Sequence, residues 1–432
     1  MVKIAVIGAG SLVFTRKLVG DLLQQEPTAD AEIRLMDIDT ERLKEVGEVV
    51  EAIVEKSGGN ARVTLTNDCA EAVRGAGYIM NTIAVGGRHA VQLDFDIPER
   101  YGIRQTIADT HGIGGISRSA RTIPQVLALA KVIEDEAPGA WLLNETNPMA
   151  MVVMSLARAT NVRHVGLCHD AENTARELAG YLDLPGPATL AWTAAGINHM
   201  TWFLTLASGG RDLYPRLRQR AEDPAVRQRD AVRFELMDRF GYFVSESSVH
   251  SAEYYPWFLH PGGNAEALGI HGREYLAILD RQEERFAENR RSVRDAGAQS
   301  SATVAQSVEY APRIVAALES NVPFTFMGNV VNTGHLIGNL PENCCVEVPC
   351  TVRGGTIVPG RAGPLPEACA ALNRMAINVQ LLAVEGILTG RRDLLYQAAY
   401  VDPMLSAQLS LDQIRQLVDE LLDAHELAGV PA

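Results

Sequence analysis

The chain is poor in several features that would point to a secreted or membrane protein. Its 432 residues contain six cysteines, too few and too unevenly spaced for the disulfide framework of a small secreted domain. No uninterrupted apolar run reaches the roughly 18 residues that a membrane-spanning helix needs. The N-terminal segment MVKIAVIGAG lacks the basic region and the cleavage site of a secretory signal. We therefore expect a cytoplasmic protein with reduced thiols and no membrane partner.

Basic residues are also scarce relative to acidic ones. The 39 lysines and arginines against 53 aspartates and glutamates leave a formal net charge of −14, and no run of basic residues interrupts this balance. Such a surface repels polyanions, so we expect no nucleic-acid partner. A hydrophobic content of 47% with 21% charged residues excludes disordered and fibrous classes and is typical of a soluble globular enzyme.

Residues 2 to about 170 alternate short β-branched runs with amphipathic helical segments. This alternation is typical of βαβ units around a parallel sheet. The expected strands are Val2–Ile7, Ile33–Met36, Val63–Thr66, Tyr78–Ile83, Ala140–Asn144 and His164–Cys168. Helices are expected at Arg16–Gln25, Glu41–Lys56 and Ser119–Glu136. The pattern predicts an α/β fold with a Rossmann-like doubly wound parallel sheet, whose ligands bind outside the carboxyl ends of the strands.

After about residue 190 the alternation stops and the chain becomes rich in helices. Strand-like pieces remain at Pro323–Asn329 and Val346–Val352. We place an NAD-binding Rossmann-like domain at residues 1–190 and a helix-rich α+β domain for catalysis, substrate binding and oligomerisation at residues 191–432. No linker separates them, so we expect the two parts to pack directly together and to complete one cleft. We also expect a homo-oligomer, either a dimer or a tetramer.

A glycine loop follows the first expected strand. Gly8-Ala9-Gly10 precedes a helix, the context in which glycines let the backbone approach a pyrophosphate. Val13 replaces the third glycine of the usual fingerprint, and glycine in such a turn also serves purely steric needs. Asp37 ends the second strand, where a carboxylate holds a ribose hydroxyl and repels a 2′-phosphate. Together these features favour NAD over NADP.

Two later segments carry groups that bind metals. Cys168-His169-Asp170 ends the sixth expected strand, and Gly196-Ile197-Asn198-His199 follows further along the chain. A thiolate and an imidazole bind divalent transition metals, and two protein ligands leave positions open for a substrate with adjacent hydroxyls. The spacing alone leaves two other interpretations open, in which Cys168 is a buried apolar residue and His199 only a hydrogen-bonding one.

Three further segments gather polar groups. Asp109–Gly115 holds three glycines, which bring the backbone close to a ligand or begin a helix near Ser117. Asn144–Pro148 ends the fifth strand with amides that suit sugar hydroxyls or a nicotinamide, or only the turn before the proline. His250–Trp257 combines groups that move protons with aromatic rings, although such rings are common in protein cores.

In this order the segments resemble glycoside hydrolase family 4, the NAD- and metal-dependent glycosidases, and within it the α-galactosidase branch. The matching segments are VIGAGSLVFTRKLVGDLL, LMDID, NTIAVGG, DIPERYGIRQTIADTHGIGGISRSARTIP, LLNETNPMAM, VGLCHD, GINHM, SAEYYPWF and GHLIGNLPENCCVEVPC. The resemblance implies an enzyme that cleaves an α-glycoside, with an α-galactoside as the expected sugar. Its implied chemistry is oxidation at C3, elimination across C1 and C2, addition of water and re-reduction.

The resemblance also implies which residues bind each group. Residues that would hold NAD are Gly8, Gly10, Ser11 and Asp37. Cys168 and His199 would bind Mn²⁺ or a similar ion. Asn147 would contact the sugar, and Arg88 is a further candidate for binding substrate.

Three residues are implied in proton transfer. Tyr254, in a motif of the EYxPW type, would remove the C2 proton, whereas Asp109 and His169 are candidates for metal-side or proton-transfer roles. Relatives that act on phosphorylated sugars carry Asn or Asp directly after the metal-binding cysteine. The presence of His169 there favours an unphosphorylated sugar. His111 stands where an apolar residue is expected in the α-galactosidase branch.

Two interpretations from other classes remain open. A 2-hydroxy-acid dehydrogenase would recruit Arg88, Arg118 and His199 as a carboxylate clamp and a proton carrier, and it would need no metal. A non-catalytic NAD-sensing module would hydrolyse no glycoside. Within the family, α-glucosidase and α-glycuronidase specificities also stay open, because hydroxyl contacts decide which sugar is bound.

Overall fold

The computed structural model describes residues 1–296 and 307–427, and a 13-stranded sheet runs through it. Its first part is parallel, with the order β3-β2-β1-β4-β5-β6. These strands are β1 Lys3–Ile7, β2 Glu32–Met36, β3 Arg62–Thr66, β4 Tyr78–Asn81, β5 Trp141–Asn144 and β6 Arg163–Leu167. All six expected strands are present, with ends that differ by at most two residues. The predicted Rossmann-like doubly wound sheet is therefore confirmed.

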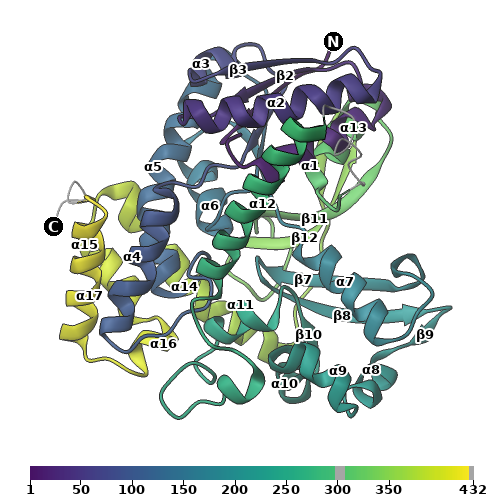
Figure 1. Ribbon diagram of the computed structural model, residues 1–432. Coiled ribbons are helices and arrows are strands. Elements are labelled where there is room, and N and C mark those ends of the chain that lie inside the picture. Colours follow the sequence, from purple (N-terminus) through teal and green to yellow (C-terminus); the bar gives the residue numbers. More distant parts are fainter. Residues whose placement is uncertain (297–306, 428–432) are drawn as a thin grey trace.

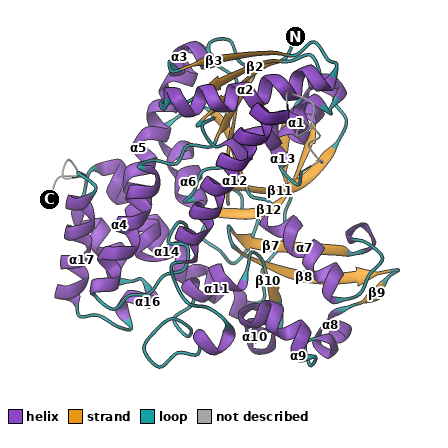
Figure 2. Cartoon of the chain, viewed as in Figure 1, coloured by secondary structure: helices purple, strands orange, loops and turns teal. Residues whose placement is uncertain are grey.

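Helices cover both faces of this parallel part, as Figure 2 shows. The helices of the N-terminal half are α1 Leu12–Leu23, η1 Glu26–Thr28, α2 Thr40–Ser57, α3 Cys69–Val73, α4 Gly87–Arg100, α5 Gly112–Glu136, α6 Met149–Ala159 and α7 Asp170–Tyr181. Every residue of β4 and β5 is buried, as parallel strands covered on both faces require.

Helix α5 begins at Gly112, ahead of the start expected near Ser117. A Cβ atom on Gly114 would lie 2.6 Å from the carbonyl oxygen of Ala108, and one on Gly115 would lie 2.6 Å from that of Thr110. The missing side chains therefore let the first turn of the helix pack directly on the loop that precedes it. That loop carries Asp109 and His111 into the interior.

The strands of the second half continue the same sheet in antiparallel orientation, in the order β6-β11-β12-β7-β8-β10. They are β7 Ala191–Ile197, β8 Met200–Ser208, β9 Arg211–Asp212, β10 Phe243–Val244, β11 Phe324–Val331, β12 Cys345–Arg353 and β13 Thr356–Pro359. The strand-like pieces expected in this half are β11 and β12, and they bridge the two halves of the chain.

The second half is also rich in helices, as expected. They are η2 Pro187–Thr189, α8 Tyr214–Arg220, α9 Pro224–Arg227, η3 Gln228–Asp230, α10 Ala231–Phe240, α11 Ser248–Tyr254, η4 Glu266–Leu268, α12 Glu274–Ala296, α13 Tyr310–Ser320, α14 Glu367–Thr389, α15 Arg392–Tyr400, α16 Pro403–Ser406 and α17 Leu411–Ala424. Helix α17 packs against α4 and α5, so the C-terminal part covers elements of the N-terminal half (Figure 1).

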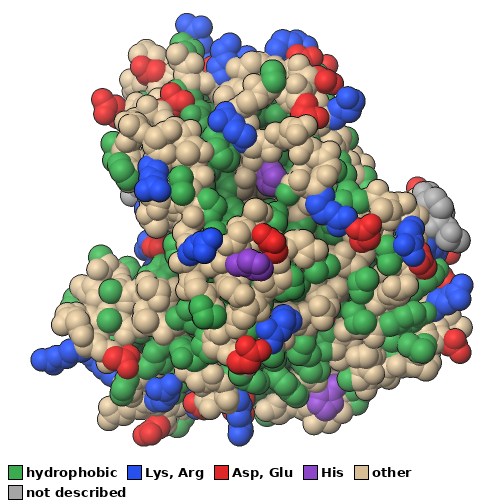
Figure 3. Space-filling model, turned by 180° about the vertical axis from the view of Figure 1, so that it is seen from behind, with side chains coloured by type: hydrophobic (Ala, Val, Ile, Leu, Met, Phe, Trp, Pro, Cys, Tyr) green, Lys and Arg blue, Asp and Glu red, His purple; other side chains and the backbone are tan. Residues whose placement is uncertain are grey.

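The surface agrees with the composition. Figure 3 shows acidic and basic side chains interspersed on the face opposite to that of Figure 1, with no continuous patch of either sign among the described residues of that face. Within residues 1–296 and 307–427, no helix is both long and apolar enough to cross a membrane.

We predict that Gly196→Ala destabilises the protein. A Cβ atom at this position of β7 would lie 2.4 Å from the backbone carbonyl oxygen of Met200, so the β7–β8 hairpin must open to admit it. Overpacking of this kind lowers the free energy of unfolding by about 1–3 kcal/mol, measured by urea denaturation. The matched control is Gly180→Ala in α7, where no atom lies within 4 Å of the added Cβ. Equal urea midpoints for the two variants would contradict the prediction.

Candidate active site

The candidate site lies where the carboxyl edge of the parallel strands meets the turn between β7 and β8. Cys168 directly follows β6, and His199 lies in the two-residue turn between Ile197 and Met200. The Cys168 Sγ atom is 3.3 Å from Nε2 of His199. The two residues expected to bind a metal are therefore in direct contact, although 31 positions separate them in the chain.

The His199 imidazole is oriented from its other side. Its Nδ1 atom is 3.1 Å from Oγ1 of Thr110 and 3.0 Å from the hydroxyl oxygen of Tyr254. The Thr110 hydroxyl donates to Oδ1 of Asp109 at 2.7 Å, so its oxygen accepts the Nδ1 proton of His199. This tautomer leaves the Nε2 lone pair directed at Cys168, which is the arrangement that a metal-binding histidine uses.

Asp109 and Asn147 meet on the same side of this cluster. The Nδ2 amide of Asn147, which follows β5, donates to Oδ2 of Asp109 at 2.9 Å. Burial would raise the pKa of Asp109, but Arg118, His250 and His199 together bring it below its usual value. Asp109 is thus a buried carboxylate that stays ionised, with an amide beside it.

Helix α11 brings Tyr254 to the cluster and fixes the loop that carries Asp109. Glu253, the preceding residue, accepts hydrogen bonds from the backbone N–H groups of Thr106, Ile107 and Ala108 at 2.8–3.1 Å. One buried carboxylate therefore holds together two segments that lie 145 to 147 positions apart in the chain. Glu253 thus fixes α11 and this loop relative to each other.

His250 lies one turn before Tyr254 on α11 and faces the same cluster. The ring centroids of His250 and His199 are 5.1 Å apart. Its Nδ1 atom is 2.6 Å from a carboxylate oxygen of Glu246. Burial would lower the pKa of His250, but Glu246 raises it to about 9. The side chain is therefore a partly buried imidazolium paired with a carboxylate near neutral pH.

The donor set fits a divalent transition metal. Two groups of ligand atoms, each within 4.8 Å of one another, share His199: one adds Cys168 and Asp170, the other Asp109 and His250. Sulfur, imidazole nitrogen and carboxylate oxygen together suit Mn²⁺, Zn²⁺ and similar ions. Burial, together with Asp170, raises the pKa of the Cys168 thiol well above its usual range, so binding a cation there would release a proton.

The glycine loop fits a dinucleotide. A Cβ atom on Gly8 would lie 2.8 Å from the backbone nitrogen of Ile83, so any side chain at this position would clash with the backbone there. The N–H group of Gly10 donates to Oδ2 of Asp37 at 2.7 Å, which ties the acid at the end of β2 to the loop. Ser11 caps α1 without a side-chain hydrogen bond to the helix, which leaves the N-terminal N–H groups available to a phosphate.

Two of the expected site residues have partners outside this cluster. Arg88 is exposed at the start of α4, and its Nη1 atom is 2.7 Å from Oδ1 of Asp280 on α12. His169 contacts Glu309, with 3.0 Å between Nδ1 and Oε2. Burial would lower the pKa of His169, but Glu309 raises it above its usual value.

The sequence interpretation did not assign a role to His250, Asp170 or Glu253. One signal was available for His250, since it stands four positions before Tyr254 and thus on the same face of a helix. Glu253 gave no such signal, because its partners are backbone groups of a distant loop.

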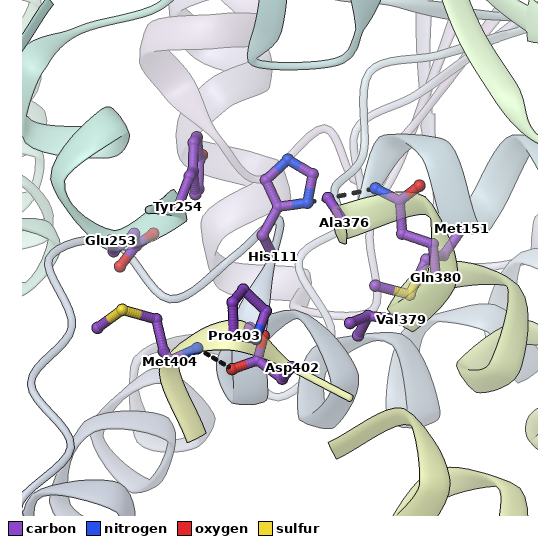
Figure 4. A pocket seen from close by; sticks show the side chains of 11 residues that line it. His111, Met151, Glu253, Tyr254, Ala376, Val379, Gln380, Asp402, Pro403 and Met404 are labelled. Atoms are coloured by element: carbon purple, nitrogen blue, oxygen red, sulfur yellow. Dashed lines mark hydrogen bonds between the residues drawn. The ribbon is translucent and has the colours of Figure 1, made fainter. Parts of the chain in front are cut away.

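A small cavity lies behind the cluster, between α11, α14 and α16 (Figure 4). It offers about 10 Å³, which is room for one water molecule. Its lining includes His111, Tyr254, Gln380 and Asp402. Burial lowers the pKa of His111 to about 3, so this ring is neutral.

Comparisons with known proteins agree with this geometry. Residues 3–184 match the model for "Family 4 glycosyl hydrolase", and residues 194–405 match the model for its C-terminal domain. An α-galactosidase of Bacillus subtilis is 43% identical over 98% of both chains. An α-galactosidase of Rhizobium meliloti is 36% identical over 98% of this chain and 88% of its own. A 6-phospho-α-glucosidase from gut microorganisms, solved with NAD and Mn²⁺, superposes with a TM-score of 0.85 at 21% identity over 98% of each chain.

We predict that Asp402→Asn stabilises the protein in a pH-dependent way. Burial raises the pKa of Asp402 from 3.8 to about 6, although its carboxylate accepts backbone hydrogen bonds from Met404 and Leu405. Well below pH 3.8 the carboxyl is protonated in the folded and the unfolded state alike. Above about pH 6 it is ionised in both, and the folded state bears the cost of desolvation.

Asparagine caps a helix as well as aspartate does. The variant should therefore differ little from the wild type at pH 3.8 and be about 2–3 kcal/mol more stable at pH 7. Urea unfolding at the two pH values measures this difference. A difference that is the same at both would contradict the prediction.

Proposed function

Since the chain belongs to family 4 of the glycosyl hydrolases, we propose that it hydrolyses an unphosphorylated α-galactoside with NAD and a divalent cation as cofactors. The observation that carries the choice of sugar is the 43% identity to an α-galactosidase over nearly the whole of both chains. The resemblance seen in the sequence is confirmed, and the protein is a glycoside hydrolase. A dehydrogenase and an NAD sensor are thereby set aside.

The cofactor sites follow from the donor groups described above. Cys168 and His199 would hold the cation. Sγ of Cys168 and Nε2 of His199 lie 3.3 Å apart, and the Nε2 lone pair is directed at the sulfur. Gly8, Gly10, Ser11 and Asp37 would hold NAD along the carboxyl edge of β1 and β2. The solved relative that contains NAD and Mn²⁺ shares this fold, which supports both assignments.

When bound, NAD supplies a hydride acceptor for the sugar, and the cation supplies a Lewis acid that polarises a carbonyl. Tyr254 would accept the C2 proton. Its hydroxyl oxygen is 3.0 Å from Nδ1 of His199, so it stands directly behind the proposed metal ligand. Burial raises the pKa of Tyr254 well above its usual value, and a positive charge at Cys168 and His199 would lower it again.

Other residues would position the sugar and move protons. Asn147 presents an amide beside the ionised Asp109, a pair suited to sugar hydroxyls. Asp109 and His169 remain the candidates for delivering a proton to the leaving group. Arg88 is the weakest of the proposed substrate contacts, because Asp280 already engages its guanidinium.

The charges near Cys168 support a sugar substrate that carries no phosphate group. The next residue is His169, which pairs with the carboxylate of Glu309. Glu309 thus already pairs with His169, so this imidazole offers little free positive charge to a sugar phosphate.

The wider assignments belong to the same proposal. We place the enzyme in the cytoplasm as a homo-oligomer, a dimer or a tetramer. We also place the division between the NAD-binding part and the C-terminal part near residue 190, which lies between the ranges that the two family models match.

A panel of nitrophenyl glycosides tests the sugar specificity. With NAD, Mn²⁺ and a thiol reductant present, the α-galactoside should have the highest kcat/KM among the α-galactoside, α-glucoside, α-galacturonide and 6-phospho-α-galactoside. Omission of either cofactor after dialysis should abolish turnover. Preference for the phosphorylated sugar would overturn the assignment of the free glycoside, and preference for another free sugar would overturn that of galactose.

Solvent exchange tests the role of Tyr254. Hydrolysis in heavy water should place deuterium at C2 of the released galactose, because an elimination breaks the C2–H bond and direct displacement at C1 does not. Tyr254→Phe should lower kcat by about 10²- to 10⁴-fold, the usual contribution of a general base. Mass spectrometry of the product and initial rates provide the two measurements.

Tyr255→Phe is the matched control, since its buried hydroxyl has no hydrogen-bond partner among the described residues. It should retain the wild-type rate. Product without deuterium, together with full activity of Tyr254→Phe, would rule out the proposed elimination.

A further inference from the structure

His111 contacts three elements besides its own: α14, the β7–β8 turn and α11. It stands at the N-terminus of α5, its Nδ1 atom is 3.2 Å from Nε2 of Gln380 on α14, and its Nε2 atom is 3.3 Å from the carbonyl oxygen of Asn198. Its ring also meets that of Tyr254 edge to face, with 4.5 Å between the centroids. All four side chains are buried.

The hydrogen bonds run in one direction. A carbonyl oxygen only accepts, so His111 carries its single proton on Nε2 and donates it to Asn198. Nδ1 is then an acceptor, and the Gln380 amide must turn its N–H₂ group toward it. Figure 4 shows this orientation, with the amide nitrogen of Gln380 directed at His111. The chain of donors is Gln380, then His111, then the carbonyl of Asn198.

The far side of Gln380 favours the same orientation. Its Oε1 atom is buried and has no hydrogen-bond partner among the residues that the structure describes, and Gln380 lines the cavity that has room for one water molecule. A water there would donate to Oε1 and keep the N–H₂ group facing His111. If the Gln380 amide were flipped, its Oε1 atom would face Nδ1 of His111, and two hydrogen-bond acceptors would be in contact.

The carbonyl that receives this bond belongs to the peptide that places His199. Asn198 and His199 are the central residues of the β7–β8 turn. His199 has a φ of 63°, and Asn198 is absent from the described residues with positive φ. In a β-turn whose second residue has a negative φ, the central peptide can take two orientations, and only one of them requires a positive φ at the third residue. Residues other than glycine adopt a positive φ at a cost in free energy. The His111 bond holds the Asn198 carbonyl in that orientation.

We propose that Gln380 and His111 are positioning residues for the metal site, which act by fixing the Asn198–His199 peptide and thereby aiming Nε2 of His199 at Cys168. The inference rests on the proposed function, since it presumes that these two residues bind the cation. Gln380 stands 269 positions after His111, so a helix of the C-terminal half would set the geometry of a ligand at the edge of the sheet.

Binding of Mn²⁺ to the purified, metal-free protein tests this. The free ion is followed by electron paramagnetic resonance, so that no turnover is needed. His111→Leu and Gln380→Leu should each weaken Mn²⁺ binding by about 10- to 100-fold, the usual effect of removing a group that orients a ligand. The double variant should be no weaker than His111→Leu alone, because both residues act through one carbonyl. Affinity for NAD should stay unchanged in all three.

Two further variants separate positioning from packing. His111→Gln can still donate to Asn198, since its amide nitrogen reaches about as far as imidazole Nε2, and it should restore Mn²⁺ affinity to within a few-fold of the wild type. Met404→Leu alters the lining of the same cavity without touching the hydrogen bonds, and it should bind Mn²⁺ as the wild type does. Equal weakening by Met404→Leu, or no rescue by glutamine, would overturn the positioning role.

Cys168→Ser and His199→Asn distinguish this failure from failure of the proposed function. Both should lose Mn²⁺ binding. If they do, while His111→Leu and Gln380→Leu bind as tightly as the wild type, the positioning role is wrong and the metal site stands. If Cys168→Ser and His199→Asn bind Mn²⁺ normally, the metal site itself is wrong.

Discussion

The antiparallel pairing of β11 with β6 joins the two halves of the chain, and the candidate active site depends on it. Gly328 and Asn329 pair with Leu167 and Gly166, directly before Cys168. Strand β12 then pairs with β11, and β7 pairs with β12 through Glu347 and Gly196. The sheet thus passes from parallel to antiparallel at β6, the strand whose carboxyl end carries Cys168. Because of this pairing the β7–β8 turn brings His199 into contact with the residue that ends β6.

Buried charge is the second feature that shapes the site. Burial opposes the ionised forms of Asp109, His250 and Glu246. Arg118 and His250 favour the ionised form of Asp109, and Glu246 and His250 favour that of each other. Glu253 is held by three backbone N–H groups. Such a cluster is costly to fold, and proteins keep costly clusters where a reaction needs fixed charge. The arrangement fits a hydrolase that oxidises and deprotonates its sugar better than one that relies on two exposed carboxylates.

The site is also built in layers. Cys168 and His199 face one another, Thr110 and Asp109 orient His199 from behind, and the bond from His111 to the Asn198 carbonyl sets the turn. Each layer comes from a different part of the chain. A small displacement of any of these groups would change the distance of 3.3 Å between Sγ of Cys168 and Nε2 of His199. Mutations far from the sugar are therefore informative about catalysis here.

The sequence by itself determined the parallel half and the residues at its strand ends, because both follow from local patterns. Alternating β-branched and amphipathic runs marked β1 to β6, and ligand-edge groups such as Gly10, Asp37 and Cys168 stand directly after the runs that position them. Only the tertiary structure decided that the second half continues the same sheet, that Arg88 pairs with Asp280, and that Gln380 reaches His111. Those contacts join residues far apart in the chain. They form because packing and hydrogen bonding of the whole fold make them favourable, and no periodicity near any one of them encodes the partner.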